Sequence, residues 1–575
     1  MSHVITVSIS GSGGSGAVTA GSVLLKGMAN AGFYGHLSRF SGPQIRGGES
    51  AVIVNFSDHP VEYAADASDL HFAFDWRGFE RFGDEIPLDR HSRILYDTAQ
   101  EALPESLEKT GAAVVDVPLH QEVKHRKGSH PSSFAIGIIA AQIGLPYASL
   151  EKAVQQLFGK KGEAFVSGML DAVRTGFHLL ETKDPMIKHW QPEQTTRWNI
   201  SGNEACALGA LRGGIKFVAA YPITPASDIV EYLAPRIEQT GGNVLIAEDE
   251  LAAMNMVIGS SFGGKPSMTA TSGPGFSLMT EAMGLAIASE TPALVINVMR
   301  GGPSTGLPTK SEQTDLNQAL FGMHGEAPHV VLAPLSIADC VLTTQWAVGL
   351  AEALQTLVVL LSDQRLGQSR AIIDAVPSKT FGLKRKVLPE QAQAEKKSYE
   401  RYGMTADHVT PMAIPGNTGE CYTADGLEHT VTGKPSSAAS DHQQQLEKRS
   451  RKITRFAYGE MWAEIVKAPK GSSIAVLTWG SAFANVKKAV LELNSEGYGI
   501  DLIALRLLMP LQADEIWKLS EEKLVIVIEQ SHSGQLYHYC LGQGAIDRSA
   551  VSLAKPGPLV LKTTEIKDFI REVSA

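Results

Sequence analysis

The sequence has few cysteines, and they are far apart. Cys206, Cys340, Cys421 and Cys540 are separated by tens of residues, and the 575-residue chain has no CxxC pair. Zinc sites and iron–sulfur clusters use closely spaced cysteines, so neither signature is present. A disulfide framework is also not expected in a chain of this length without an export signal. We therefore predict four reduced thiols.

Long apolar runs and an excess of basic residues are also missing. No apolar stretch approaches the roughly 20 residues that a membrane-spanning helix needs. The 61 acidic and 51 basic side chains give a net charge of −10, unlike a nucleic-acid or anionic-membrane binder. Residues 4–9 already have a strand pattern, and nothing before them looks like an export signal. We expect a cytoplasmic protein whose partners are small molecules and other proteins.

What the sequence does contain is an alternation of strand and helix patterns. Residues 217–220 followed by 227–237 are one example, and apolar runs such as 293–298 and 474–477 are typical of strands buried on both faces. The alternation predicts an α/β fold with parallel sheets, and the length implies several domains. We predict three α/β domains at 1–195, 196–377 and 453–575, and an extended linker at 378–452, where periodic patterning fades.

Two glycine-rich segments in the first domain have more than one interpretation. Gly11 to Gly16 follows a strand and opens a helix, so its N–H groups could hold a phosphate, for example of CoA. The acid that a dinucleotide site places about 20 residues later is missing, because that region reads FYGHLSRF. A tight turn without a ligand explains the loop equally well. The same alternatives stay open for Arg46 to Ser50.

Polar groups after several predicted strands each have an ordinary structural explanation. Glu250 opens a helix, where an acid commonly complements the helix dipole. The TATSGPG run that ends at Gly275 suits a turn. The two prolines of residues 221–225 make a rigid corner. A lone arginine such as Arg300 more often forms a surface ion pair. However, Arg300 would lie at the C-terminal edge of a parallel sheet, where ligands usually bind.

Taken together, these segments resemble the 2-oxoacid:ferredoxin oxidoreductases, specifically an alpha subunit with a gamma-type domain fused at its N-terminus. The segments YPITP, EDE with AAMNMVIGSSFGG, TATSGPGFSLMTE and VMRGGPSTGLPTKSEQTDL occur in the family's order and approximate spacing. GSGGSGAVTAG with the later RGGES resembles the gamma domain. The resemblance implies a gamma-type domain at 1–195, a pyrimidine-binding domain for thiamine diphosphate at 196–377, and a transketolase C-terminal-like domain at 453–575.

The resemblance also implies a cofactor site. Enzymes of this family use thiamine diphosphate, and a glutamate that faces ring nitrogen N1′ favours the imino form of its aminopyrimidine. Glu250 is the matching position and is preferred over Glu248. The apolar residues after Glu250 would favour proton sharing over full ionisation. Tyr221, Pro222 and Ile223 are the other positions expected to bind the cofactor.

Three positions match residues that hold the 2-oxoacid substrate. Arg300 would bind its carboxylate, since a planar guanidinium can donate two charge-assisted hydrogen bonds. Thr224 and Thr309 would orient the carbonyl or the carboxylate for reaction. The run around Arg300 looks most like the 2-oxoglutarate branch, whose second carboxylate needs another cation. Lys310 and a residue of another chain are both candidates.

The rest of such a site is not found in this chain. The sequence has no GDG followed by asparagines of the type that binds Mg²⁺ and the diphosphate, and no cysteine cluster for electron transfer. The resemblance implies a beta subunit that supplies Mg²⁺, the diphosphate contacts and a [4Fe–4S] cluster. An (αβ)2 complex is the expected assembly, because closed symmetry is common.

The implied reaction converts 2-oxoglutarate, CoA and oxidised ferredoxin to succinyl-CoA, CO₂ and reduced ferredoxin. It is reversible, so carbon fixation is a possible direction. Pyruvate and branched-chain 2-oxoacids are alternative substrates. A thiamine-dependent component that transfers its acyl group to lipoamide is another alternative, against which the fused gamma-type domain argues. The alternative of another class is a noncatalytic assembly scaffold that keeps only the fold.

Overall fold

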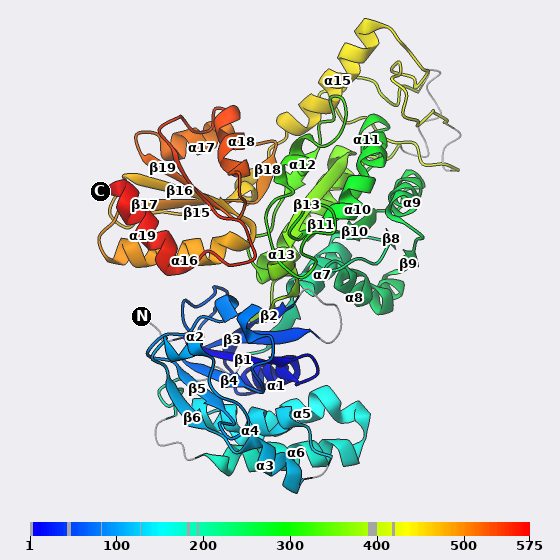
Figure 1. The fold of residues 1–575 in the computed structure, drawn as a ribbon. Helices are drawn as coiled ribbons and strands as arrows, with labels where there is room; N and C mark the ends of the chain where they lie inside the picture. The colour runs from blue at the N-terminus through cyan, green and yellow to red at the C-terminus, as the bar shows by residue number, and fades with distance from the viewer. Residues whose placement is uncertain are drawn as a thin grey trace. The chain divides into compact units, whose positions relative to one another are not determined.

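The chain forms two compact units (Figure 1). The first unit comprises Met1–Ser201, Gln368–Val376 and Lys562–Thr564, and the second comprises Gly202–Gly367, Pro377–Leu561 and Glu565–Ala575. This computed structural model describes residues 4–42, 48–81, 83–126, 128–180, 185–191, 195–388, 399–416 and 420–575. Within those ranges, every helix is too short or too polar to cross a bilayer.

The first unit is built on an eight-stranded sheet in the order β6-β5-β4-β1-β3-β2-β14-β7. Its strands are β1 (Ile5–Ser12), β2 (Tyr34–Ser41), β3 (Glu49–Ser57), β4 (Leu70–Ala73), β5 (Arg93–Tyr96), β6 (Ala113–Asp116), β7 (Arg197–Ser201) and β14 (Arg370–Asp374). In this order, the neighbouring strands from β6 through β5 and β4 to β1 are parallel. The neighbouring strands from β1 through β3, β2 and β14 to β7 are antiparallel.

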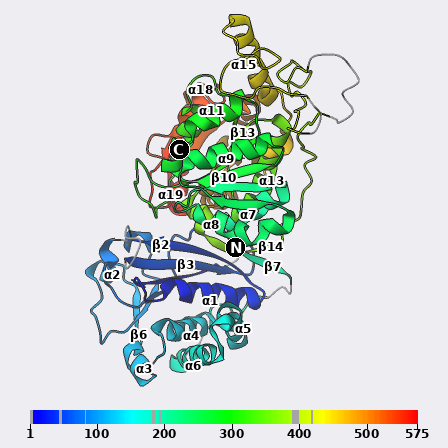
Figure 2. The same ribbon diagram turned by 90° about the vertical axis from the view of Figure 1, so that its right-hand side faces the viewer.

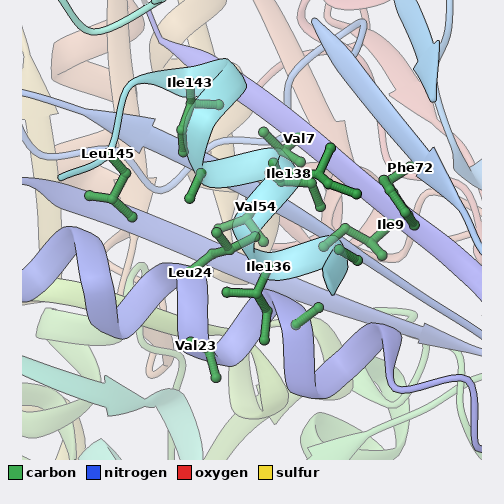
Figure 3. Close-up of a cluster of buried hydrophobic side chains, with 14 of the residues drawn as sticks. Val7, Ile9, Val23, Leu24, Val54, Phe72, Ile136, Ile138, Ile143 and Leu145 are labelled. Carbon is green, nitrogen blue, oxygen red and sulfur yellow. The ribbon is translucent and has the colours of Figure 1, made fainter. Parts of the chain in front are cut away.

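Apolar side chains of this sheet pack against helices on one face. The helices of this packing are α1 (Ala17–Asn30), α3 (Leu119–His125), α4 (Pro131–Ile143), α5 (Tyr147–Phe158) and α6 (Glu163–Leu179), whereas α2 (Glu105–Glu108) contributes Leu107 to a separate cluster. Figure 3 shows Val7 and Ile9 of β1 among Leu24 of α1 and Ile136 and Ile138 of α4. This cluster is the core of the first unit.

The loop between β1 and α1 is a tight turn, as the sequence predicts. Gly14 and Gly16 have φ of 91° and 89°, a region that glycine adopts without strain. The N–H of Ser12, at the start of the loop, already donates to the carboxylate of Asp75 at 3.1 Å. The loop's role as a phosphate site stays an open prediction. In the second glycine-rich segment, Arg46 and Gly47 lie outside the described residues.

The second unit contains a seven-stranded sheet in the order β18-β12-β13-β11-β10-β8-β9. Its strands are β8 (Phe217–Ala220), β9 (Asn243–Ile246), β10 (Ser267–Thr271), β11 (Ala293–Met299), β12 (Val330–Leu332), β13 (Leu357–Asp363) and β18 (Leu507–Met509). All neighbours are parallel except β12 and β18. The described helices that accompany it are α7 (Gly202–Gly213), α8 (Ser227–Ile237), α9 (Glu250–Phe262), α10 (Gly273–Leu278), α11 (Thr280–Ala288), α12 (Leu316–Phe321), α13 (Ile337–Leu354) and α14 (Gln364–Gln368).

The second unit also holds a five-stranded sheet in the order β15-β17-β16-β19-β20. Its strands are β15 (Ala463–Val466), β16 (Ile474–Trp479), β17 (Ile500–Leu505), β19 (Leu524–Glu529) and β20 (Val551–Ala554). The described helices beside it are α16 (Phe483–Ser495), α17 (Ala513–Ser520), α18 (Gln535–Gly542) and α19 (Thr563–Ser574). Three sheets flanked by helices confirm the predicted multidomain α/β class.

Two features differ from the predicted layout. The segment 378–452, predicted as an extended linker, leads into the 16-residue helix α15 (Ala439–Thr454), which sequence reasoning missed (Figure 2). Its sequence is polar, yet Lys448 and Lys452 are completely buried. In addition, β7 and β14 join the first sheet, although both lie inside the predicted second domain. A strand far along the chain can complete a sheet, and no local pattern reveals its partner.

Candidate active site

The predicted site segments follow neighbouring parallel strands of the second unit. Strands β9, β8, β10 and β11 lie side by side in that order (Figure 1). After these strands end, the chain reaches Glu248 after β9, Tyr221 after β8, Ser272 after β10 and Arg300 after β11. Because the carboxyl ends of parallel strands share one edge of the sheet, the fold brings the four segments to that edge, where ligands usually bind.

Glu250 is buried at the start of α9. The residue is only 5% exposed, whereas Glu248 and Asp249 are exposed. Asp249 caps the helix, because its Oδ1 accepts a hydrogen bond from the N–H of Ala252 at 2.7 Å. Asp249 therefore fills the ordinary role of an acid at a helix start, which is to cap the helix. Capping does not explain why Glu250 is buried.

The backbone of α10 packs directly against the Glu250 carboxylate. A Cβ atom at Gly275 would lie 2.4 Å from Oε1 of Glu250 and 2.2 Å from Oγ1 of Thr271. Both distances are shorter than any real contact, so only glycine fits at this position. The glycine after Pro274 thus keeps one side of the carboxylate free of a side chain.

Arg300 is held at the end of β11. Its Nη1 donates to the carbonyl oxygen of Thr224 at 2.6 Å, which joins two of the predicted substrate-binding positions. Its Nε is buried and has no hydrogen-bond partner among the described residues. Burial lowers the pKa of the guanidinium, and the negative charge of Asp315 opposes that effect. Arg300 therefore keeps a donor for an additional acceptor.

A cavity of about 510 Å³ opens beside Arg300. The described residues that line it are Gly273, Pro274 and Ser277 of α10, Arg300, Gly301, Gly302, Pro303 and Ser304, and Glu312, Thr314, Asp315 and Gln318. Small-molecule sites commonly have volumes of about 300–1,000 Å³. The cavity is large enough for a small organic acid, and one end of it carries a buried arginine.

Two acids in this cavity were not predicted as site residues. Burial raises the pKa of Asp315 and also that of Glu312. Oδ2 of Asp315 accepts a hydrogen bond from Nδ2 of Asn297 at 2.9 Å. Both carboxyl groups are therefore harder to ionise than solvent-exposed acids. Both acids lie in the SEQTDL part of the quoted run, but their nearness to Arg300 arises only on folding.

The third α/β segment holds the acidic side of the cavity in place. The side chain of Gln313 donates through Nε2 to the carbonyl oxygen of Trp479 at 2.9 Å and accepts from the N–H of Gln530 at 2.8 Å. The N–H of Gln313 also donates to the carbonyl oxygen of Gln530 at 2.9 Å. The five-stranded sheet therefore sets the position of the neighbouring residues Glu312 and Thr314.

The other predicted positions surround this arrangement without lining the cavity. Tyr221, Pro222 and Thr224 are exposed, and Ile223 is half-buried. Thr309 and Lys310 are half-buried, and neither is among the described residues of the cavity wall. The N–H of Gly301 donates to the carbonyl oxygen of Lys310 at 2.9 Å, so the loop after Arg300 closes on itself. The roles of these residues stay predictions. In the ranges that the structure describes, no group of three or more His, Cys, Asp or Glu residues is arranged to hold a metal ion.

Two family descriptions match the sequence. Residues 208–448 match the family described as pyruvate flavodoxin/ferredoxin oxidoreductase, thiamine diP-binding. Residues 6–179 match pyruvate ferredoxin/flavodoxin oxidoreductase. Together the matches include the candidate site and most of the first sheet.

Two named relatives align with this chain, one over most of its length and one over part of it. It is 30% identical to the 2-oxoacid:ferredoxin oxidoreductase subunit alpha of Saccharolobus solfataricus, over 92% of this chain and 91% of the relative. It is 36% identical to the 2-oxoglutarate synthase subunit KorA of Methanothermobacter marburgensis, over 60% of this chain and 90% of the relative.

A solved structure matches the whole fold. The 2-oxoglutarate:ferredoxin oxidoreductase of Magnetococcus marinus, with 2-oxoglutarate, coenzyme A and succinyl-CoA bound, superposes with a TM-score of 0.92. It is 31% identical, and the match covers 100% of both chains.

Proposed function

The chain belongs to the 2-oxoacid:ferredoxin oxidoreductase family, and from this premise we propose that it is the alpha subunit of an enzyme that interconverts 2-oxoglutarate and succinyl-CoA. The forward reaction consumes 2-oxoglutarate, CoA and two oxidised ferredoxins, and yields succinyl-CoA, CO₂, two reduced ferredoxins and a proton. The observation that carries the proposal is the buried pair of predicted residues, Glu250 and Arg300, at one edge of the second sheet.

Glu250 fits the role of the residue that faces the aminopyrimidine of thiamine diphosphate. The family description of residues 208–448 names thiamine diphosphate binding. Bound there, the cofactor would supply the electron sink that a 2-oxoacid needs in order to lose CO₂. Glu250 would hold a proton at ring nitrogen N1′, the role that the family resemblance implies for it, and its buried carboxylate lies against the backbone at Gly275. Tyr221, Pro222 and Ile223 would contact the ring from the exit of β8.

Arg300 and its cavity fit the recognition of the 2-oxoacid. The guanidinium would bind the carboxylate next to the carbonyl, using the unpartnered Nε. Its contact with the Thr224 carbonyl fixes the plane of the guanidinium. Thr224 and Thr309 would orient the carbonyl for reaction, which lowers the entropic part of the barrier. The second carboxylate would be bound by a cation, either Lys310 or a residue of another chain.

A beta subunit is needed to complete this site. We propose that it supplies Mg²⁺, the contacts to the diphosphate and a [4Fe–4S] cluster for electron transfer to ferredoxin, in an (αβ)2 complex. Several large apolar side chains are exposed at the proposed cofactor edge: Tyr221, Leu245, Ile246, Leu251 and Leu278. Leu245 and Ile246 belong to the edge strand β9. Exposed apolar groups gathered in this way are typical of a surface that a protein partner covers.

The remaining sequence predictions are kept as proposals. They assign a gamma-type domain to residues 1–195, the pyrimidine-binding domain to 196–377 apart from β7 and β14 of the first sheet, the linker to 378–452 up to the start of α15, and the transketolase C-terminal-like domain to 453–575. CoA is the proposed cosubstrate, and the cytoplasm the proposed location.

An anaerobic assay tests this function directly. The complex that copurifies with the full chain would be mixed with oxidised ferredoxin, and ferredoxin reduction followed with 2-oxoglutarate or pyruvate, with and without CoA. We expect reduction that requires 2-oxoglutarate and CoA together. Faster turnover with pyruvate would contradict the substrate assignment. If a complex that contains thiamine diphosphate and iron fails to reduce ferredoxin with either substrate, the proposed reaction is contradicted for both.

Substitution of Arg300 by Lys tests the substrate-binding role. We expect KM for 2-oxoglutarate to rise about 10- to 100-fold, because a lysine cannot replace a two-point charge-assisted contact worth about 1.5–3 kcal/mol. KM for CoA should stay within about twofold, so steady-state kinetics with each substrate varied in turn separate the two effects. Arg236→Lys, at an exposed arginine of α8, is the matched control. Equal changes in both KM values would argue against a specific carboxylate contact.

A further inference from the structure

The second unit contains another cavity, whose lining shares no residue with that of the candidate site. Its volume is about 400 Å³, and it lies where the end of α13, residues 382–386, residues 406–409 and the end of α15 meet. Nothing in the proposed reaction uses these segments. The cavity is within the size range of small-molecule sites.

Cationic side chains dominate the wall of this cavity. Five of them line it: Lys384, Lys386, Arg451, Lys452 and Arg455. The one acid among the described lining residues is Asp407, which pairs with Lys386. Within the cavity wall, Lys386 is thus a cation with a carboxylate beside it.

Most of these cations have no acid of their own within the cavity. Arg451 pairs with Glu447 on its outer side at 2.8 Å, and Lys452 reaches Glu290 at 3.2 Å. Lys384 and Arg455 form no ion pair within the described part of the chain. Grouping cations without counter-charges is unfavourable unless an anion joins them.

His408 adds a second, independent observation. The residue is only 6% exposed, and it lines the cavity. Neither of its ring nitrogens has a hydrogen-bond partner among the described residues. Burial and the positive charges of Arg455 and Arg451 lower the pKa of the ring. A neutral imidazole still carries one N–H, and a buried donor without an acceptor is rare in proteins.

The lining also includes apolar side chains. Phe456 and Leu383 are half-buried lining residues, and Ala353 and Leu354 belong to the same lining. An aromatic ring and an aliphatic side chain offer a surface for the organic part of a ligand, whereas the cations and His408 offer donors for its anionic part.

We propose that this cavity binds an organic phosphate of about nucleotide size. The phosphate would accept hydrogen bonds from Lys384, Arg455 and His408, and the organic group would lie against Phe456. Phosphate is favoured as the anion because it accepts from several donors at once and carries a charge that Lys384 and Arg455, the lining cations with no ion pair in the described part of the chain, can balance. This inference concerns a site separate from the proposed reaction and does not depend on it.

Calorimetric titration of the purified complex tests the proposal, with ADP and inorganic pyrophosphate as probes. We expect ADP to bind more tightly than pyrophosphate, because only ADP can use Phe456. In the Arg455→Glu variant, the ADP affinity of one site per chain should fall at least about tenfold. The loss of one charge-assisted hydrogen bond has an effect of this size. ADP bound at any other site of the complex would be unaffected by this change.

Lys434→Glu is the matched control, since it makes the same charge reversal at an exposed lysine outside the cavity. It should bind ADP as the wild type does. If Arg455→Glu does not fold, as judged by its melting temperature, Lys384→Glu replaces it, because Lys384 is exposed and lines the same cavity. Equal ADP binding in the wild type and the cavity variants would overturn the proposal. So would binding of pyrophosphate as tight as that of ADP.

Discussion

Replacing Glu250 by Gln is expected to lower kcat of the CoA-dependent reduction of ferredoxin by about 10²–10⁴-fold, the usual contribution of a positioned acid–base group. A glutamine has nearly the same shape, but it cannot hold and release a proton at the cofactor ring. Because glutamine is nearly isosteric with the buried glutamate at the start of α9, the substitution should leave the fold and the assembly unchanged.

The neighbouring Glu248 provides the matched control. Glu248→Gln makes the same chemical change two residues earlier, at an exposed position. Its kcat should stay within about twofold of the wild-type value, because surface substitutions away from a site have small effects. Both variants would be compared in the anaerobic assay, with the thiamine diphosphate content of each complex measured alongside. If Glu250→Gln turned over as fast as Glu248→Gln, the proposed role of Glu250 would be wrong, and a scaffold function would gain support.

Replacing Glu290 by Gln is expected to destabilise the second unit by about 3–5 kcal/mol, the usual cost of breaking a completely buried ion pair. Glu290 lies between α11 and β11 and is 0% exposed. Its carboxylate accepts from Nζ of Lys448 at 2.6 Å and from Nζ of Lys452 at 3.2 Å, both on α15. Burial opposes its ionisation, but Lys448, Lys452 and Arg401 outweigh burial and hold the pKa of Glu290 well below its usual range. Without this anion, α15 would leave buried cations uncompensated.

The destabilisation should depend on pH in a defined direction. Burial lowers the pKa of Lys452 to about 7 in the folded chain, from an ordinary value of 10.5. Between these values the unfolded chain binds more protons at this lysine, so stability rises with pH there. Loss of Glu290 lowers the folded-state pKa of Lys452 further below about 7, so the deficit of the variant should shrink as the pH rises toward about 7 and stay nearly constant from about 7 to about 9. A deficit that grows with pH would contradict this account.

Hydrogen exchange can locate the effect of Glu290→Gln. We expect faster exchange in α15 than in the five-stranded sheet, because the helix loses the contact that holds its buried lysines. Glu515→Gln is the control, since Glu515 pairs with Lys518 at an exposed position, and surface pairs contribute about 0–1 kcal/mol. Similar exchange of α15 in both variants would mean that other contacts hold the helix.

The predicted elements agree best with the structure where strands are buried on both faces. The predicted strand at 217–220 and helix at 227–237 coincide with β8 and α8, and the apolar run at 293–298 became β11. A continuous apolar run bounded by turn residues has few alternatives to a central parallel strand. Helix α15 escaped prediction for the opposite reason. It is mostly polar, and buried ion pairs hold it where an apolar stripe would normally be expected.

The sequence by itself determined the α/β class and the family, because those depend on local patterns and on motifs next to strand ends. Only the tertiary structure decided which acid of the EDE run is buried, that Gly275 lies against it, and that Arg300 contacts the Thr224 carbonyl 76 residues away in the chain. It also brought Asp315 and Glu312 into the cavity and gathered five cations from segments as distant as 384 and 455. Burial and the pairing of distant strands depend on the whole packed chain, so no window of sequence contains them.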